Sequence, residues 1–226
     1  MAAHPDIGLV HACPLALLPH ETPGAHGEEP LALGPHAVLV VGRMSSGERY
    51  KGHDQLIDAW PAVVARVPDA QLVIVGDGDD RARLTARAAA AGSCGASILF
   101  TGFIPQADLD ALFARAALFA LPSRGEGFGL VYLEAMAHAL PCVGSIHDAA
   151  GDVIVDGVTG RLVDQGDVSN LASTLATLLA DAPLRHRMGT AGRERVLAHF
   201  TFERFCERAL RLIEHAADRQ AVAVGV

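Results

Sequence analysis

From residue 36 onward, short apolar runs alternate with segments of helical periodicity, and this alternation constrains the fold more than any other feature. We expect six strands, at Ala37–Val41, Gln71–Val75, Ser97–Phe100, Ala117–Leu121, Pro141–Gly144 and Gly160–Val163. Helices are expected at Asp54–Val67, Asp80–Ala91, Asp108–Ala116, Phe128–Ala139, Ser169–Ala180, Leu184–His199 and Phe202–Ala217. Strands that alternate with helices form a parallel sheet covered on both faces. The sequence therefore predicts an α/β fold with a doubly wound, mostly parallel, six-stranded Rossmann-like sheet.

The charge balance argues against nucleic acid as a partner. The formal net charge is −8, with acidic and basic residues interspersed, whereas non-specific binding to nucleic acid needs a basic face.

No apolar run approaches the roughly 20 residues that a membrane-spanning helix needs. The cysteines lie far apart and the histidines show no metal-ligand spacing, so we expect no metal site.

A glycine-rich turn leads directly into a helical pattern at Ser123–Glu134. Glycine lets a ligand approach the backbone closely, and the free N–H groups of a helix's first turn suit a phosphate. Glu126 lies in the turn, and Glu134 should lie about two turns into the helix, near the same face. Ionised carboxylates accept hydrogen bonds from hydroxyls. The pattern therefore favours a ligand that combines phosphate with sugar hydroxyls, which is a sugar nucleotide.

Two basic residues, Arg43 and Lys51, follow the first predicted strand. Arginine offers a rigid fork of donors and lysine a mobile point charge, so together they could neutralise a departing diphosphate. The alternative is that both are exposed loop cations.

Two further strand ends carry weaker signals. The loop Thr101–Pro105 could offer backbone groups to a nucleobase edge, or could simply connect a strand to a helix. The segment Gly76–Arg81 begins like a dinucleotide fingerprint but lacks its third glycine, which argues against a nicotinamide oxidoreductase. We interpret it as a strand-end turn in which Asp79 or Asp80 caps the next helix.

Together these motifs resemble the nucleotide-sugar-binding half of retaining glycosyltransferases of the GT-B fold, specifically glycosyltransferase family 4, the glycosyl transferases group 1 family. The similarity covers roughly residues 36–216. Glu126 and Glu134 resemble the family's Glu-x7-Glu motif, which implies that Glu126 contacts the donor sugar and Glu134 the ribose. Arg43 and Lys51 resemble its basic pair on the diphosphate, so the implied catalytic residues are Glu126, Arg43 and Lys51. The other implied donor-binding residues are Gly42, Gly102, Phe103, Ile104, Gly127, Phe128, Gly129, Leu130 and Val131.

The resemblance implies a metal-independent transferase without a cofactor. It would move a glycosyl group from a UDP-, GDP- or ADP-sugar to a hydroxyl of a glycan, a lipid-linked sugar or a small molecule, with retention. Two alternatives stay open. One is a non-catalytic donor-binding half that needs a partner chain, and the other is a nucleotide-sugar epimerase or sugar phosphorylase of similar fold.

Length is the main departure from the family pattern, because such enzymes usually have two Rossmann-like domains. We expect residues 1–35 to be a linker or the stub of a missing amino-terminal, acceptor-binding domain, and residues 36–226 to form the donor-binding domain. That acceptor-binding domain could be supplied by a separate chain. The amino terminus lacks the positive charge of a signal peptide, so we expect a cytoplasmic protein, with peripheral binding at the inner membrane face as an alternative.

Overall fold

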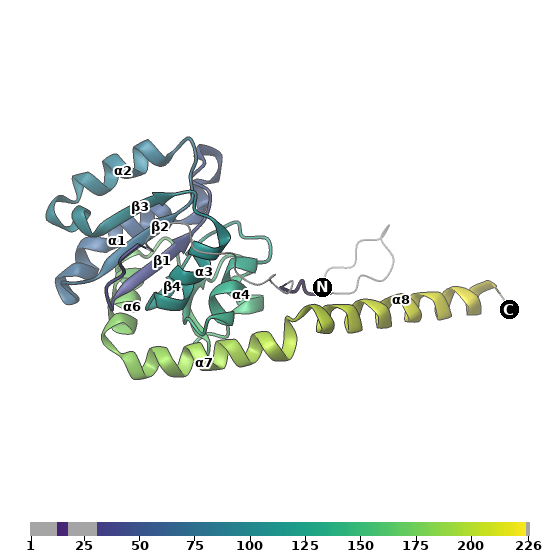
Figure 1. The fold of residues 1–226 in the computed structure, drawn as a ribbon. Helices are drawn as coiled ribbons and strands as arrows, with labels where there is room; N and C mark the ends of the chain where they lie inside the picture. Colours follow the sequence, from purple (N-terminus) through teal and green to yellow (C-terminus); the bar gives the residue numbers. More distant parts are fainter. Residues whose placement is uncertain (1–12, 18–30, 225–226) are drawn as a thin grey trace.

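The computed structural model describes residues 13–17 and 31–224, with side chains described as far as residue 215. Six parallel strands form one sheet in the order β3-β2-β1-β4-β5-β6 (Figure 1). They are β1 (Ala37–Val41), β2 (Gln71–Val75), β3 (Ile98–Gly102), β4 (Leu118–Ala120), β5 (Cys142–Ser145) and β6 (Gly160–Val163). The predicted six-stranded, doubly wound sheet is confirmed.

The central strands are apolar along their whole length because both faces of the sheet are covered. Residues Ala37–Val40 of β1 and all of β4 are buried. β1 pairs with β2 in register from Ala37 opposite Gln71 to Val41 opposite Val75. Such continuous burial is typical of a parallel sheet between two helical layers.

The helices form those two layers. Their bounds are α1 (His53–Arg66), α2 (Arg81–Ala90), α3 (Gln106–Arg115), α4 (Leu130–Ala137), α5 (Ala150–Val153), α6 (Val168–Ala180), α7 (Ala182–His199) and α8 (Phe202–Val224), with 3-10 helices η1 (Ser46–Lys51) and η2 (Gly92–Ser97). α1 contacts α2 and α6, whereas α4 contacts α5 and α7. Right-handed crossovers put α1 and α2 on one face and α3, α4 and α5 on the other. α8 extends away from the body (Figure 1).

Several predicted boundaries were wrong. α4 begins at Leu130, not at Phe128, because Gly129 has the left-handed backbone angle φ = 83°, which is not helical. Glu134 therefore lies little more than one turn into the helix. The sequence analysis also missed α5, η2 and η1, the last of which begins after Ser45, whose hydroxyl accepts a hydrogen bond from the N–H of Gly47.

Part of the predicted linker can be placed. Residues 13–17 lie beside the junction of α7 and α8, where the N–H of Leu17 donates to the carbonyl of Phe200 (3.0 Å). Arg208 of α8 donates to the carbonyl of Pro14 (3.2 Å). Residues 1–12 and 18–30 of that segment lie outside the described residues.

The strand order creates a switch point. β1 lies between β2 and β4, so the chain winds in opposite directions on either side of β1. In such sheets, the loops after the two strands at the switch point diverge and open a crevice at the carboxyl ends of those strands. The loops that follow β1 and β4 therefore border the place where a ligand is expected.

Candidate functional site

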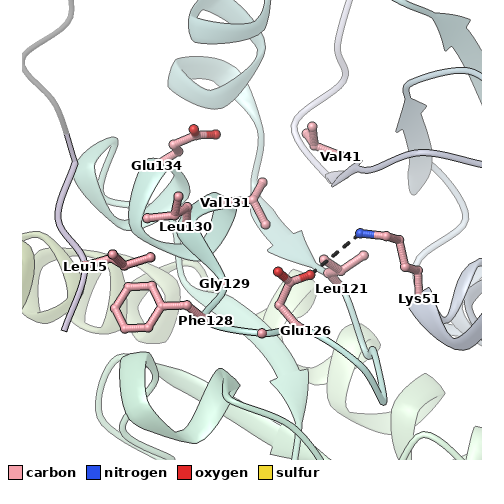
Figure 2. A pocket seen from close by; sticks show the side chains of 11 residues that line it. Leu15, Val41, Lys51, Leu121, Glu126, Phe128, Gly129, Leu130, Val131 and Glu134 are labelled. Atoms are coloured by element: carbon pink, nitrogen blue, oxygen red, sulfur yellow. Dashed lines mark ion pairs between the residues drawn. The ribbon is translucent and has the colours of Figure 1, made fainter. Parts of the chain in front are cut away.

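A cavity of about 620 Å³ lies at this switch point. Val41 at the end of β1 and Leu121 just after β4 form part of its wall (Figure 2). The remaining lining residues are Leu15, Lys51, Glu126, Gly127, Phe128, Gly129, Leu130, Val131 and Glu134. The cavity thus combines an apolar base with one cation, two carboxylates and the start of α4.

Lys51 and Glu126 face each other across the cavity (Figure 2). The Nζ atom of Lys51 lies 3.7 Å from Oε2 of Glu126, and the two side chains are 17% and 21% exposed. Lys51 comes from the loop after β1 and Glu126 from the loop after β4. The full sequence contains no other lysine.

The segment that carries Lys51 is bonded to neighbouring loops through the carbonyl of Tyr50. This oxygen accepts hydrogen bonds from the N–H of Arg124 (2.9 Å) and from Nε2 of Gln165 (2.7 Å). Gly52 has φ = 87° and packs so closely on the carbonyl of Pro122 that a Cβ there would collide with it. Three loops, after β1, β4 and β6, therefore meet beside Lys51.

The backbone of Glu126 is held on both sides by the loop after β5. Oδ2 of Asp148 accepts from the N–H of Glu126 (3.3 Å), and the carbonyl of Glu126 accepts from the N–H of Ala149 (3.3 Å). Oδ1 of Asp148 accepts from the N–H of Ala150 (2.9 Å). Burial raises the pKa of Asp148 above its usual range, and these backbone donors oppose that rise.

The start of α4 opens into the cavity because no side chain caps it at Gly129. A Cβ at Gly129 would overlap the ring of Tyr132, so glycine is required there for packing as well as for backbone angle. The hydroxyl of Tyr132 donates to the carbonyl of Leu121, which ties α4 to the end of β4. An uncapped helix start of this kind presents N–H groups and a partial positive charge to an anion.

Eight of the predicted site residues therefore lie together in the cavity wall. They are Lys51, Glu126, Gly127, Phe128, Gly129, Leu130, Val131 and Glu134. The strand order accounts for this grouping, because it places the loops after β1 and β4 at one crevice.

Five predicted site residues lie outside the wall of this cavity. Arg43 is 74% exposed and donates to Oε1 of Glu48 (2.6 Å). Phe103 is 84% exposed, whereas Ile104 is partly buried against the core. Gly102 accepts a hydrogen bond from the N–H of Gly76 (2.9 Å). Gly42 is the fifth, and the side chains of Lys51 and His53 lie close to its Cα.

Asp79 and Asp80 do not cap α2 with their side chains, contrary to the sequence prediction. No side-chain hydrogen bond is made at the Asp80 cap, because its carboxylate binds Arg49 (2.9 Å) and Arg83 (2.6 Å). These guanidinium groups pull the pKa of Asp80 well below its usual range. Asp79 instead binds the backbone and hydroxyl of Ser46. Both aspartates thus hold η1, the segment that leads to Lys51.

Several residues that hold the site together were not predicted from the sequence. Asp148 and His53 were not among the candidate residues. Tyr50 and Gln165 carried no local signal, because their bond joins residues that lie 115 positions apart. Such long-range contacts leave no periodicity in the sequence.

Two kinds of feature are absent from the residues that the structure describes. Within residues 13–17 and 31–224, no group of three or more His, Cys, Asp or Glu side chains is arranged to hold a metal ion. Among the helices in the part of the chain that the structure describes, none combines the length and apolar character needed to cross a membrane.

Comparisons with known proteins identify the family of this chain. Residues 25–195 match the model of the family described as glycosyl transferases group 1. The chain is 35% identical to a GDP-mannose-dependent alpha-(1-6)-phosphatidylinositol monomannoside mannosyltransferase of Mycolicibacterium smegmatis, over 92% of this chain and 58% of that protein. It is 40% identical to a phosphatidyl-myo-inositol mannosyltransferase of Mycobacterium leprae, over 70% of this chain and 41% of that protein. The chain thus spans about half the length of these relatives.

Two solved structures share the fold. Sucrose-phosphate synthase from Thermosynechococcus elongatus superposes with a TM-score of 0.72 at 30% identity, over 83% of this chain and 47% of that one. The carboxy-terminal domain of a glycosyl transferase group 1 family protein from Francisella tularensis gives 0.67 at 26% identity, over 74% of this chain and 87% of that one. The fold is therefore that of the carboxy-terminal domain of a GT-B glycosyltransferase. From the matched family model and this architecture, the chain belongs to the glycosyl transferases group 1 family.

Proposed function

We propose that this chain binds a nucleotide-diphosphate sugar in the switch-point cavity and forms the donor half of a retaining, metal-independent glycosyltransferase. The observation that carries the proposal is the meeting of Lys51, Glu126 and the uncapped start of α4 in one cavity. An anion site beside two carboxylates suits a ligand with both phosphates and hydroxyls.

Each part of the cavity has a proposed role. The backbone N–H groups of residues 127–131 and the Nζ atom of Lys51 bind the diphosphate. Glu126 accepts hydrogen bonds from hydroxyls of the donor sugar, and Glu134 accepts them from the ribose. Phe103 and Ile104, with the backbone of Gly42 and Gly102, border the base.

Arg43 completes the basic pair by leaving Glu48. Its guanidinium is already exposed, so turning it toward a diphosphate exchanges one ion pair for another. The bond between the anomeric carbon and the diphosphate oxygen breaks, the acceptor oxygen bonds to the same face of the sugar, and the proton of the acceptor hydroxyl passes to the departing diphosphate. Positive groups placed beforehand around the departing diphosphate lower the barrier, because charge develops there in the transition state.

GDP-mannose is the first donor to test. The relatives from Mycolicibacterium smegmatis and Corynebacterium glutamicum carry GDP-mannose in their names. Those names also contain phosphatidylinositol mannosides, which supports a lipid-linked sugar as the acceptor. We place the chain in the cytoplasm, at the inner membrane face, where such an acceptor is reached.

The chain covers about half of these relatives, so we propose that the acceptor-binding part lies in a separate domain or chain. Residues 36–226 would form the donor-binding unit and residues 1–35 its connection to that part.

Calorimetric titration tests the donor site. GDP, UDP and ADP, and their common sugar conjugates, are titrated into the purified chain without added metal. We expect saturable binding to one base series, weakened about tenfold or more by Lys51→Ala, because a hydrogen bond to a charged group contributes about 1.5–3 kcal/mol. Arg66→Ala is the matched control, since Arg66 lies at the far end of α1 and contacts Ser173 and Thr177. Absence of binding by the unmodified chain counts against the proposal.

One alternative is favoured by a specific observation. Because the chain spans 58% of the Mycolicibacterium smegmatis relative, it can be a donor-binding half that transfers nothing by itself. Assaying transfer to a lipid-linked sugar separates the two. Turnover well above that of Glu126→Ala supports a complete enzyme, whereas binding without turnover supports the donor-binding half.

A further inference from the structure

One buried polar atom next to the cavity has no partner in the part of the chain that the structure describes. His53 is 3% exposed, and its Nε2 atom makes no hydrogen bond there. Leaving a buried polar atom unpaired destabilises the folded state, because the atom loses its hydrogen bonds to water. Native proteins rarely keep such an atom unless it binds water or acts at a functional site.

The position of His53 relates this atom to the cavity. His53 is the first residue of α1, two positions after Lys51. Its Nε2 and Cε1 atoms lie 3.9 Å from the point where a Cβ of Gly42 would stand, and Cδ of Lys51 lies 3.6 Å from the same point. The imidazole edge and the stem of Lys51 thus share the space over Gly42, at the carboxyl end of β1.

Burial also determines the charge of this ring. Desolvation and the neighbouring Lys51 lower the pKa of His53 from 6.5 to about 4, while Asp54 and Asp80 oppose this change and Arg83 assists it. The ring is therefore neutral at pH 7, and each neutral imidazole carries one N–H donor.

We propose that His53 is a further donor-binding residue, whose Nε2–H group hydrogen-bonds a phosphate oxygen of the nucleotide sugar. In the free protein the stem of Lys51 lies beside this atom in the space over Gly42, and the Nζ atom of Lys51 is paired with Glu126. When a diphosphate draws Lys51 away from Glu126, the stem moves off and Nε2 faces the ligand. This inference rests on the proposed donor site.

Three variants test it. His53→Leu removes the donor, and His53→Gln keeps an amide N–H near the place of Nε2. His36→Leu is the matched control, because His36 precedes β1 and so lies at the opposite end of that strand from Gly42. Affinity for the best-binding nucleoside diphosphate is measured by calorimetry and the midpoint of thermal unfolding by circular dichroism.

We expect His53→Leu to weaken binding about tenfold while leaving the unfolding midpoint equal or higher, since it removes an unpaired polar atom. His53→Gln should recover most of the affinity. An affinity of His53→Leu within twofold of the unmodified chain would overturn the inference and leave the proposed donor site standing. If the unmodified chain binds no nucleotide, both fail together.

If His53→Leu loses both stability and affinity, the loss of affinity could come from partial unfolding. A direct measurement of the His53 ring is therefore made as well. The ¹⁵N shifts of the His53 ring are recorded in the unmodified chain with and without saturating nucleotide. A shifted Nε2 signal from a ring that stays neutral supports the hydrogen bond, and unchanged ring signals overturn it.

Discussion

Lys51 and Glu126 form an ion pair of 3.7 Å across the switch-point cavity. The pair is loose, since 3.7 Å exceeds the usual length of a charge-assisted hydrogen bond. Both side chains retain some exposure to solvent. A diphosphate carries more negative charge than one carboxylate, so in the proposed complex it would compete for Lys51 and leave Glu126 to the sugar.

The first prediction uses the single lysine of the chain. An amine-reactive reagent should modify only Lys51 and the terminal amine. Saturating nucleoside diphosphate should slow modification of Lys51 several-fold, because a bound phosphate covers its Nζ atom. Peptide mass spectrometry measures both sites, and the terminal amine serves as the internal control. Equal protection of both sites, or none, would contradict a phosphate contact at Lys51.

The second prediction separates the two glutamates. Glu126→Ala should weaken binding of the sugar conjugate about tenfold and leave the bare nucleoside diphosphate nearly unchanged, since in the proposed site Glu126 contacts only the sugar. Glu134→Ala should weaken both ligands alike, because both contain ribose. Each lost hydrogen bond to a carboxylate accounts for about 1.5–3 kcal/mol. Paired titrations with GDP and GDP-mannose, or with the matching pair of another base, measure the affinity of each variant for the two ligands. An equal loss of affinity for both ligands in Glu126→Ala would refute the assignment of Glu126 to the sugar.

The third prediction concerns the loss of stability at acidic pH. The pKa of His53 is lowered to about 4 in the folded chain, so between pH 6.5 and 4 the unfolded chain binds a proton that the folded chain does not. The stability contributed by neutral His53 is fully present above pH 6.5 and is lost as the pH falls through this window, by roughly 3 kcal/mol at most. Urea unfolding at pH 7 and pH 4.5 should show a larger loss for the unmodified chain than for His53→Leu. Parallel losses would contradict a buried neutral ring.

The fourth prediction concerns the start of α4. Gly129→Ala adds a Cβ that overlaps the ring of Tyr132 and places alanine at φ = 83°. We expect a loss of unfolding free energy of about 1–3 kcal/mol and weaker nucleotide binding. Gly127→Ala is the control for the unfolding measurement, since a Cβ there meets no atom within 4 Å. Equal stability of the two variants would show that the left-handed turn is not required.

The fold was largely predictable because the alternation of apolar runs and helical segments carries it. The predicted bounds of β1, β2 and β6 match the structure, whereas only Leu118–Ala120 of the predicted run Ala117–Leu121 forms β4. Ala117 and Leu121 flank β4 and still donate backbone hydrogen bonds to the carbonyls of Ala37 and Val143, but neither has a register partner in a neighbouring strand. Hydrophobicity reports burial, while strand limits depend on the neighbouring strand.

The candidate site was predictable only in part. Lys51 and Glu126 could be brought together in advance, because loops at the carboxyl ends of parallel strands share one edge. Exposure of Arg43 was one of two alternatives left open, but its ion pair with Glu48 could not be predicted, because the 3-10 helix η1 that contains Glu48 was missed. The hydrogen bond between Asp148 and Glu126 could not be predicted either, since the carboxylate of Asp148 accepts from the backbone N–H of Glu126 and not from its side chain.

The carbonyl of Tyr50 has a consequence for the order of folding. Its bond to Gln165 closes a loop of 115 positions, and closing a long loop costs chain entropy that must be offset by contacts formed at the same time. The contacts that position Lys51 are therefore complete only after the last strand, β6, has joined the sheet. Ligand binding at Lys51 therefore requires the fully folded chain. A partly folded chain in which β6 is not yet paired lacks the contact that positions Lys51.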